Sequence, residues 1–291
     1  MANLKEIRNR ITSVGSTMQI TSAMKMVSAA KLKRAQDAIT QMRPYANKLK
    51  DILGNLSASL DLSENALAAD RGDGKVLIVA ITSNRGLCGG FNNNVIKQVN
   101  QLMVTDFIKS DVKILCLGKK GKDAFRHAEG FYTSEDTDRV PDIFSDLTFD
   151  NTAILAQAMM DRFLDKSFDR VVVVYNSFIN AASQVVKVEQ LLPIIPTVQE
   201  GTTSVDYIFE PSKEEIVEEL IPKSLKIQLF KALLDSNASE NGARMTAMHK
   251  ATDNAKEMKR NLTLSYNKAR QAAITSEILE IVGGAEALSG K

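Results

Sequence analysis

An unbroken heptad pattern over residues 4–56 constrains the fold more than any other feature of this sequence. Thirteen of its sixteen a and d positions are apolar. The a positions are Leu4, Ile11, Met18, Lys25, Leu32, Ile39, Ala46 and Leu53, and the d positions are Ile7, Val14, Thr21, Ser28, Ala35, Met42, Leu49 and Leu56. One register kept throughout predicts a single long helix that packs against another helix in a coiled coil. Pro44 lies inside this helix and lacks a backbone donor, so we expect a kink or a local adjustment there.

The polar exceptions in this seam are consecutive. Thr21, Lys25 and Ser28 interrupt it for about a turn and a half, and Met24 and Met26 flank the interruption. A seam that turns polar here either tolerates solvent or meets something other than its partner helix.

The C-terminal segment carries a similar stripe. No proline follows Pro222, and apolar residues recur at spacings of three and four. They are Ala255, Met258, Leu262, Tyr266, Ala269 and Ala273, followed on a shifted face by Ile274, Ile278, Ile281, Ala285 and Leu288. Since neither terminal helix can bury its stripe alone, we expect an antiparallel pair with the rest of the chain inserted between them. The alternative is two helices that pack separately on a globular domain.

The middle of the chain alternates strand and helix patterns. Short runs rich in valine and isoleucine predict buried strands. The expected strands are Lys75–Ser83, Val112–Leu117, Val171–Ser177 and Gln184–Leu192, the last two forming a hairpin, and the expected helices cover 93–107, 122–127 and 151–165. This order predicts a small, Rossmann-like α/β domain with a mostly parallel sheet. The chain then divides into an N-terminal coiled-coil helix (1–58), an α/β domain (74–195) and a C-terminal coiled-coil helix (210–291).

Charge is distributed unevenly along the chain. The net charge is +2, but residues 1–50 carry ten basic against two acidic side chains, and residues 244–270 carry seven against two. Two basic ends suggest a shared partner or site. One candidate class is an interaction protein whose basic coiled coil inserts into an acidic or tightly fitting partner. The other is a nucleic-acid binder, which lacks aromatic residues among these charges beyond Tyr45 and Tyr266 and leaves the apolar seam unexplained, so we favour the first.

Few residues suggest chemistry. Loops 85–90 and 118–122 follow predicted strands, where α/β proteins bind phosphates, but neither matches a dinucleotide or P-loop motif, so tight turns are favoured over nucleotide binding. Cys88 and Cys116 form no CxxC or Cys/His set. Three closely spaced acidic residues favour a solvated loop over a metal site; they are Asp136, Asp138 and Asp142. We expect no catalytic constellation, no metal and no cofactor.

Motifs at both ends and in the middle of the chain match one family in the same order. They are KEIRNRITSV (5–14), ITSAMKMV (20–27), ITSNRGLCGG (81–90), ARMTAM (243–248), ATDN (251–254), YNKARQAAIT (266–275) and EILEIV (277–282). Together they resemble the gamma subunit of F-type ATP synthases over essentially the whole chain. Residues 130–150 carry no motif of this kind.

The resemblance implies a fold and a function. The terminal helices would form an antiparallel coiled coil inside a ring of three alpha and three beta subunits, with the α/β domain at the foot against the epsilon subunit and the c ring. Ion flow would turn that ring and, with it, one copy of this chain, biasing the beta sites in sequence for ATP synthesis or hydrolysis. It would thereby also regulate ATPase activity and proton flow. The chain itself would perform no catalysis, hold no cofactor and bind no nucleic acid.

The resemblance also implies residue roles. Contacts with the catalytic ring would be made by Met24, Lys25, Arg85, Arg270, Gln271 and Thr275, and contacts with the c ring by Tyr207, Phe209 and Glu210. Met24 and Lys25 would face an acidic loop of beta, which offers a reason for the polar interruption of the seam. The alternative is that a shaft in a tight sleeve is constrained by overall shape, so that single side chains contribute little.

The resemblance finally bears on location and regulation. The chloroplast branch of the family carries a redox-active cysteine pair that this chain lacks, and Cys88 and Cys116 are 28 residues apart, so we expect no thiol regulation. No signal or transit pattern precedes the helix. We expect a bacterial protein bound peripherally at the cytoplasmic face of the inner membrane.

Overall fold

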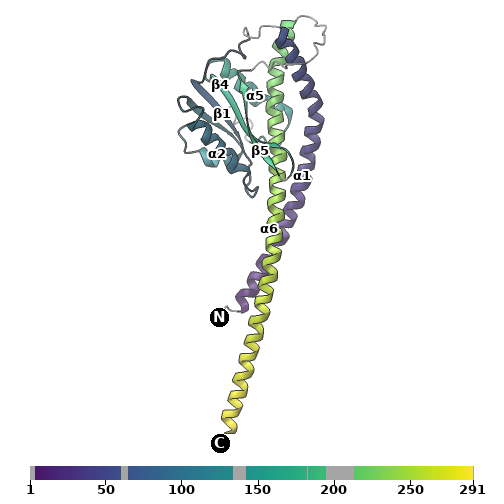
Figure 1. Ribbon diagram of the computed structural model, residues 1–291, viewed down its shortest axis with the longest axis vertical. Coiled ribbons are helices and arrows are strands. Elements are labelled where there is room, and N and C mark those ends of the chain that lie inside the picture. The colour runs from purple at the N-terminus through teal and green to yellow at the C-terminus, as the bar shows by residue number, and fades with distance from the viewer. Residues whose placement is uncertain (1–3, 60–64, 134–141, 182, 195–212, 291) are drawn as a thin grey trace. The chain divides into compact units, whose positions relative to one another are not determined.

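The computed structural model describes residues 4–59, 65–133, 142–181, 183–194 and 213–290 (Figure 1). The chain divides into two compact units, Ser28–Arg244 and the two terminal segments Met1–Val27 and Met245–Lys291. The two long helices, α1 (Leu4–Ser59) and α6 (Lys213–Ser289), contribute residues to both units. Across the described ranges, every helix is too short or too polar to span a membrane.

The predicted long N-terminal helix is confirmed, because α1 continues through Pro44 without a break. Each predicted seam position whose side chain is described is buried or half-buried, and the fully buried apolar ones are Ile7, Leu32, Ala35, Ile39 and Leu49. The heptad register therefore identifies the face of α1 that packs against other parts of the chain.

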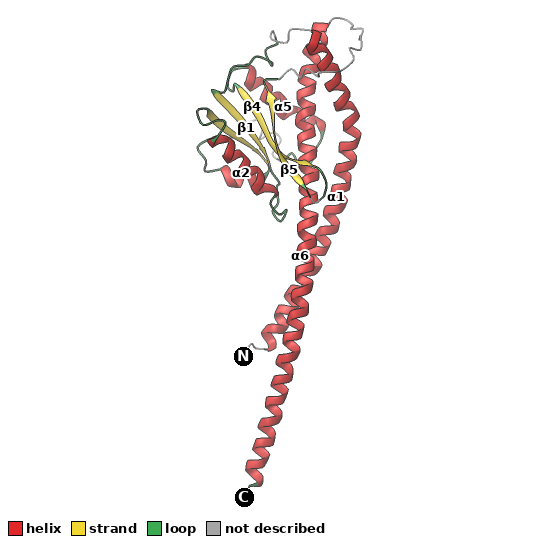
Figure 2. Cartoon of the chain, viewed as in Figure 1, coloured by secondary structure: helices red, strands yellow, loops and turns green. Residues whose placement is uncertain are grey.

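The larger unit contains a five-stranded sheet in the order β3-β2-β1-β4-β5 (Figure 2). The strands are β1 (Lys75–Ile81), β2 (Asp111–Leu117), β3 (Phe131–Tyr132), β4 (Arg170–Phe178) and β5 (Gln184–Leu192). All neighbours pair in parallel except β4 and β5, which form the predicted antiparallel hairpin. Sequence analysis missed β3, since two residues are too few to show a periodicity.

Helices cover both faces of this sheet. Along β1, Val76, Ile78 and Ala80 pack toward α2 (Phe91–Val104) and α3 (Lys119–Phe125), while Leu77, Val79 and Ile81 pack toward α5 (Phe149–Leu164) and α6. Burial on both faces explains why the strands read as continuous apolar runs and not as alternating patterns.

The first half of α6 belongs to the core of the α/β domain. Ile221, Leu225, Leu229 and Leu233 recur every four residues and are buried against the sheet and α5. The C-terminal helix, which was predicted only as half of a coiled coil, therefore also covers one face of the sheet within Ser28–Arg244.

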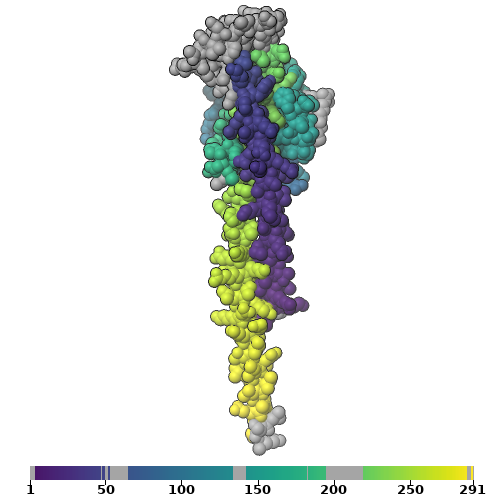
Figure 3. Space-filling view, turned by 90° about the vertical axis from the view of Figure 1, so that its right-hand side faces the viewer, coloured from purple at the N-terminus to yellow at the C-terminus, as the bar shows by residue number. Residues whose placement is uncertain are grey.

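In the smaller unit, α1 and α6 pair in antiparallel fashion, as predicted. Thr252 Oγ1 lies 2.8 Å from Thr21 Oγ1, and His249 Nδ1 lies 3.4 Å from Lys25 Nζ. From Thr21 to Lys25 the contact moves four residues toward the C-terminus of α1, while on α6 it moves three residues toward the N-terminus, from Thr252 to His249. The two helices therefore run antiparallel. The space-filling view shows the two helices side by side, with the end of α6 continuing beyond α1 (Figure 3).

The predicted stripe on α6 is buried only in part, and its continuation at Ile274, Ile278, Ile281 and Ala285 is exposed. Ala255 is buried and Leu262, Tyr266 and Ala269 are half-buried, but Met258 is 54% exposed and Ala273 is exposed. Lys259 is half-buried at the position adjacent to Met258. A long lysine side chain can lie along an apolar seam with its ammonium in water, so residue polarity alone misidentified this position.

Gly118, between β2 and α3, provides a test of the fold. It has φ +110°, and a Cβ there would lie 2.1 Å from the Thr82 carbonyl oxygen. We expect Gly118→Ala to lower the free energy of unfolding by about 2–5 kcal/mol, measured by urea denaturation of the full chain. Gly89→Ala is the matched control, with φ +60° and open space around the new methyl group, and should cost about 1–2 kcal/mol. Equal losses would contradict the role assigned to the close approach to Thr82.

Candidate partner-contact surfaces

The polar interruption of the α1 seam is hydrogen-bonded within the chain. The Thr252 hydroxyl donates to Thr21 Oγ1 at 2.8 Å, and the buried Thr21 hydroxyl can donate to the Thr17 carbonyl at 3.0 Å. Buried hydroxyls that are paired in this way cost little, so the seam tolerates polar side chains here without an outside partner. At Thr21 the seam is therefore neither open to solvent nor turned away from its partner helix, so this contact supports neither of the two explanations considered.

Lys25 lies next to the imidazole of His249. Besides the 3.4 Å approach of Lys25 Nζ to His249 Nδ1, the same ring nitrogen lies 3.5 Å from Asp253 Oδ2. Both His249 and Asp253 are more than half exposed, and Lys25 is half-buried, as is its neighbour Met24. Lysine, histidine and aspartate thus form a small charged cluster at the surface of the helix pair, which an acidic or polar partner could reach.

Sequence analysis missed a second exposed face of α1 at the same level. Ile20 is 60%, Met26 65% and Val27 57% exposed. Ile20, Ala23 and Val27 recur at three- and four-residue spacings outside the seam, and this repeat was the available signal. Exposed apolar side chains grouped on one helix face are typical of a protein contact surface.

Among the described residues of the smaller unit, nothing covers the end of α6. From Arg270 to Glu286 every residue is exposed, including the predicted contact residues Gln271 and Thr275. Thr275 Oγ1 donates to the Gln271 carbonyl at 2.9 Å, within the helix. The large apolar side chains of this segment are about half exposed or more; they are Ile274, Ile278, Leu279, Ile281 and Val282.

The loop after β1 holds Arg85 at the surface of the larger unit. Ser83 supports the loop twice: its amide donates to Asn92 Oδ1 at 2.9 Å, and its hydroxyl donates to the Arg85 carbonyl at 2.7 Å. Arg85 itself is exposed, and no carboxylate of the described residues lies within ion-pair distance of its guanidinium. The backbone is therefore fixed while the charge remains available.

Arg244 of α6 clamps the same loop. Its Nη2 donates to the carbonyls of Arg85 at 2.9 Å and Gly86 at 3.3 Å, and its Nη1 pairs with Glu240. Only 12% of the Arg244 side chain and 13% of the Glu240 side chain are exposed. A buried guanidinium with one carboxylate and two carbonyl partners is a well-satisfied charge, and it ties the Arg85 backbone to the long helix.

The remaining candidates show no catalytic arrangement. Cys88 and Cys116 are both free and buried, and burial raises the pKa of the Cys116 thiol to about 12, with Lys122 opposing the shift. Burial also raises the pKa of Asp235, while Lys231 and the Ser177 hydroxyl, which donates to it at 3.3 Å, oppose the shift. Over the described residues, no group of three or more His, Cys, Asp or Glu side chains is arranged to hold a metal.

Several predicted residues lie outside the described residues. They are Asp136 and Asp138 of the acidic loop and Tyr207, Phe209 and Glu210 of the predicted c-ring contact. Met24 and Lys25 lie together on α1, and Arg270, Gln271 and Thr275 on the uncovered end of α6, both in the smaller unit, whereas Arg85 lies in the larger one.

Comparison with known proteins identifies the family. A family model described as ATP synthase matches residues 3–288. The ATP synthase gamma chain of Flavobacterium psychrophilum is 61% identical, and that of Geotalea daltonii 46%, with both chains of each pair covered completely. The chain belongs to the ATP synthase gamma chain family. It is a central-stalk rotor subunit of an F-type ATP synthase and takes part in ATP synthesis.

Solved structures agree with this assignment. A chain of the central stalk and c ring of the Tetrahymena thermophila mitochondrial ATP synthase is 25% identical with a TM-score of 0.57, covering 80% of this chain and 99% of that one. A chain of the Euglena gracilis enzyme has a TM-score of 0.67 at 21% identity, covering 98% and 94%, and so shares the fold.

Arg244→Met should loosen the loop that carries Arg85. We expect amide hydrogen exchange at residues 84–90 to rise at least tenfold, because the two carbonyls lose their donor. Glu240→Gln is the matched control, since it removes the ion pair while Arg244 keeps both carbonyl contacts. Unchanged exchange in Arg244→Met, or an equal rise in both variants, would contradict the clamp.

Proposed function

We propose that this chain is the single-copy, non-catalytic rotor that couples c-ring rotation to the nucleotide sites of three beta subunits. In this proposal, helices 1–58 and 210–291 form one shaft inside the alpha3beta3 ring, and the α/β domain (74–195) contacts the epsilon subunit and the c ring. The complex lies at the cytoplasmic face of a bacterial inner membrane, to which the chain binds peripherally. Through the same coupling the chain regulates ATP hydrolysis and proton flow.

The uncovered end of α6 carries this proposal. Five large apolar side chains between Ile274 and Val282 are about half exposed or more, within a run from Arg270 to Glu286 in which every residue is exposed. Burying such a side chain contributes on the order of 1.5–3 kcal/mol, so this segment has a strong requirement for a surrounding partner. A close-fitting collar of alpha and beta subunits would supply that burial while Arg270, Gln271 and Thr275 contact its loops.

Asymmetry would turn rotation into chemistry at beta. The Lys25–His249–Asp253 cluster and the exposed Ile20 face give the helix pair different chemistry on different sides. A beta subunit facing the cluster meets charge, and one facing Ile20 and Val27 meets apolar surface. Since a partner shifts a conformational equilibrium only by its differential contacts, these differences would hold the three beta sites in different states.

The composition of the complex tests this proposal. Native mass spectrometry on a complex purified through a tag on this chain should find one copy with three each of two larger nucleotide-binding subunits. Self-association, or a nucleic-acid complex that salt dissociates, would favour the basic-arm hypothesis instead.

Charge reversal tests the contact residues. Lys25→Glu and Arg85→Glu should each lower proton-driven ATP synthesis several-fold in membrane vesicles, because they put like charge against the proposed acidic surfaces of the ring. The urea midpoint of the isolated chain should change little, since both side chains are partly or fully exposed. Lys97→Glu, an exposed reversal on α2, is the control and should leave synthesis intact. Unchanged synthesis in both test variants would refute the assigned contacts.

Two deletions test the two parts of the α6 end. Removal of 262–275 takes out two heptads, including the half-buried Leu262, Tyr266 and Ala269, and should abolish copurification with the catalytic ring. Removal of 283–291 leaves the seam and the contact residues in place and should be better tolerated. Equal loss of assembly in the two truncations would count against this division of the helix.

A further inference from the structure

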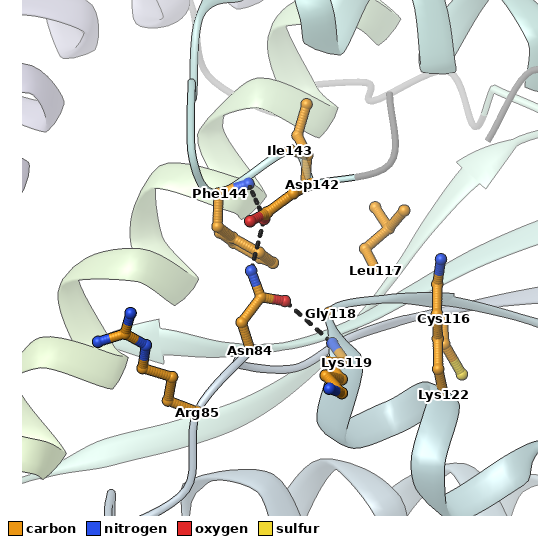
Figure 4. Close-up of a pocket in the computed structure, with 10 residues that line it drawn as sticks. All are labelled: Asn84, Arg85, Cys116, Leu117, Gly118, Lys119, Lys122, Asp142, Ile143 and Phe144. Atoms are coloured by element: carbon orange, nitrogen blue, oxygen red, sulfur yellow. Dashed lines mark hydrogen bonds between the residues drawn. The ribbon is translucent and has the colours of Figure 1, made fainter. Parts of the chain in front are cut away.

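A pocket of about 480 Å³ opens at the carboxyl edge of the sheet, between the ends of β1 and β2 (Figure 4). The loops that follow these strands, 85–90 and 118–122, each lack a nucleotide motif in sequence, yet the fold brings them to the same cavity. This edge is where open α/β sheets bind their ligands, because the strand ends and the following helices meet there.

Two lysines of α3 give the pocket a cationic side. Lys119 and Lys122 both line it, and Arg85 lies at its margin beyond Asn84. Across the part of the chain that the structure describes, neither lysine has a carboxylate within ion-pair distance, whereas the intervening Lys120 pairs with Asp123 at 3.6 Å. Like charges gathered around a concave, partly desolvated space attract an anion more strongly than lysines on an open surface.

Asp142, the acidic side chain among the described residues that line the pocket, is already hydrogen-bonded. Asp142 Oδ1 accepts from Asn84 Nδ2 and from the Phe144 amide at 3.2 Å, and Asn84 Oδ1 in turn accepts from the Lys119 amide at 3.0 Å. Figure 4 shows Asn84 bridging the two sides of the cavity through these bonds. These bonds fix the pocket walls and occupy Asp142 Oδ1. Asp142 keeps its negative charge, but the described lining sets three cationic side chains against it: Arg85, Lys119 and Lys122.

The turn between β2 and α3 holds these lysines close to the strand ends. The Gly121 amide donates to Thr82 Oγ1 at 2.8 Å, and a Cβ on Gly121 would lie 2.9 Å from the same oxygen. A larger residue would push α3 away from β1. Opposite the lysines, Ile143 and Phe144 provide an apolar wall.

We propose that this pocket binds a phosphorylated organic molecule of about mononucleotide size, with its phosphate at Lys119 and Lys122 and its apolar part against Ile143 and Phe144. The volume falls in the range of small-molecule sites, and inorganic phosphate alone would leave most of it unfilled. This proposal is separate from the proposed rotor function and shares one residue with it, Arg85, which lines the pocket margin and is also a proposed contact with the catalytic ring.

Calorimetric titration of the isolated full-length chain, free of catalytic beta subunits, tests the site with AMP, adenosine and inorganic phosphate as probes. AMP should bind most tightly, and its affinity should fall with added salt. Lys119→Gln with Lys122→Gln should lower AMP affinity at least tenfold. Lys120→Gln, the ion-paired lysine between them, is the matched control and should leave affinity unchanged.

Phe144→Ala separates the two halves of the site. It should weaken AMP binding while inorganic phosphate binding stays the same, and thermal unfolding of each variant confirms that it is folded. No AMP binding to the wild-type chain, or binding indifferent to the lysine pair, would overturn the proposal. Lysine-dependent binding of an oligoglutamate peptide without AMP binding would also overturn it, in favour of an acidic protein segment.

Discussion

The antiparallel contact between α1 and α6 is the constraint on which the terminal unit depends. Each helix carries an apolar stripe too narrow for a globular core and too long to leave in water, so each requires the other. The register is marked by polar pairs, Thr21 with Thr252 and Lys25 with His249. The Lys25–His249 pair lies at the surface, whereas Thr21 is buried. A buried polar contact stabilises little by itself, but a slip of the seam would leave the Thr21 hydroxyl against an unsuitable partner, so it favours one alignment.

Along its length, α6 has three different environments. The apolar face of residues 221–233 is buried in the core of the α/β domain, residues 248–269 supply the seam of the terminal unit, and residues 270–286 are exposed. The helix α6 is uninterrupted through all three, so the same element belongs to the α/β domain and to the terminal unit. Because α1 and α6 each pass from one compact unit into the other, the boundaries between the units fall within helices and not at loops.

The sequence predicted the elements well and their environments less well. The α1 seam, four of the five strands and the hairpin were predictable, since each shows a periodicity or a β-branched run. The sequence could not reveal that Ile221 and Leu229 pack on a sheet, because an apolar stripe with a four-residue repeat has the same pattern whether it faces a helix or a sheet. The sequence pattern also placed Met258 in the seam, where the structure has Lys259. A pattern of apolar residues counts lysine as polar, whereas its alkyl stem can pack like an apolar side chain.

For the candidate functional residues, too, the sequence predicted the positions better than the surroundings. The motif resemblance singled out Lys25 and Arg85. The structure adds that Arg244 fixes the loop that carries Arg85 and that His249 lies next to Lys25. Such contacts leave no local sequence pattern, because the partners are far apart in the chain: Arg85 and Arg244 are separated by 159 positions, and Lys25 and His249 by 224. For the same reason, two glycine-containing loops that look like ordinary turns individually form a basic pocket together. The proposed phosphate ligand would link the stability of the folded chain to ligand concentration, since any ligand of the folded state stabilises it by mass action.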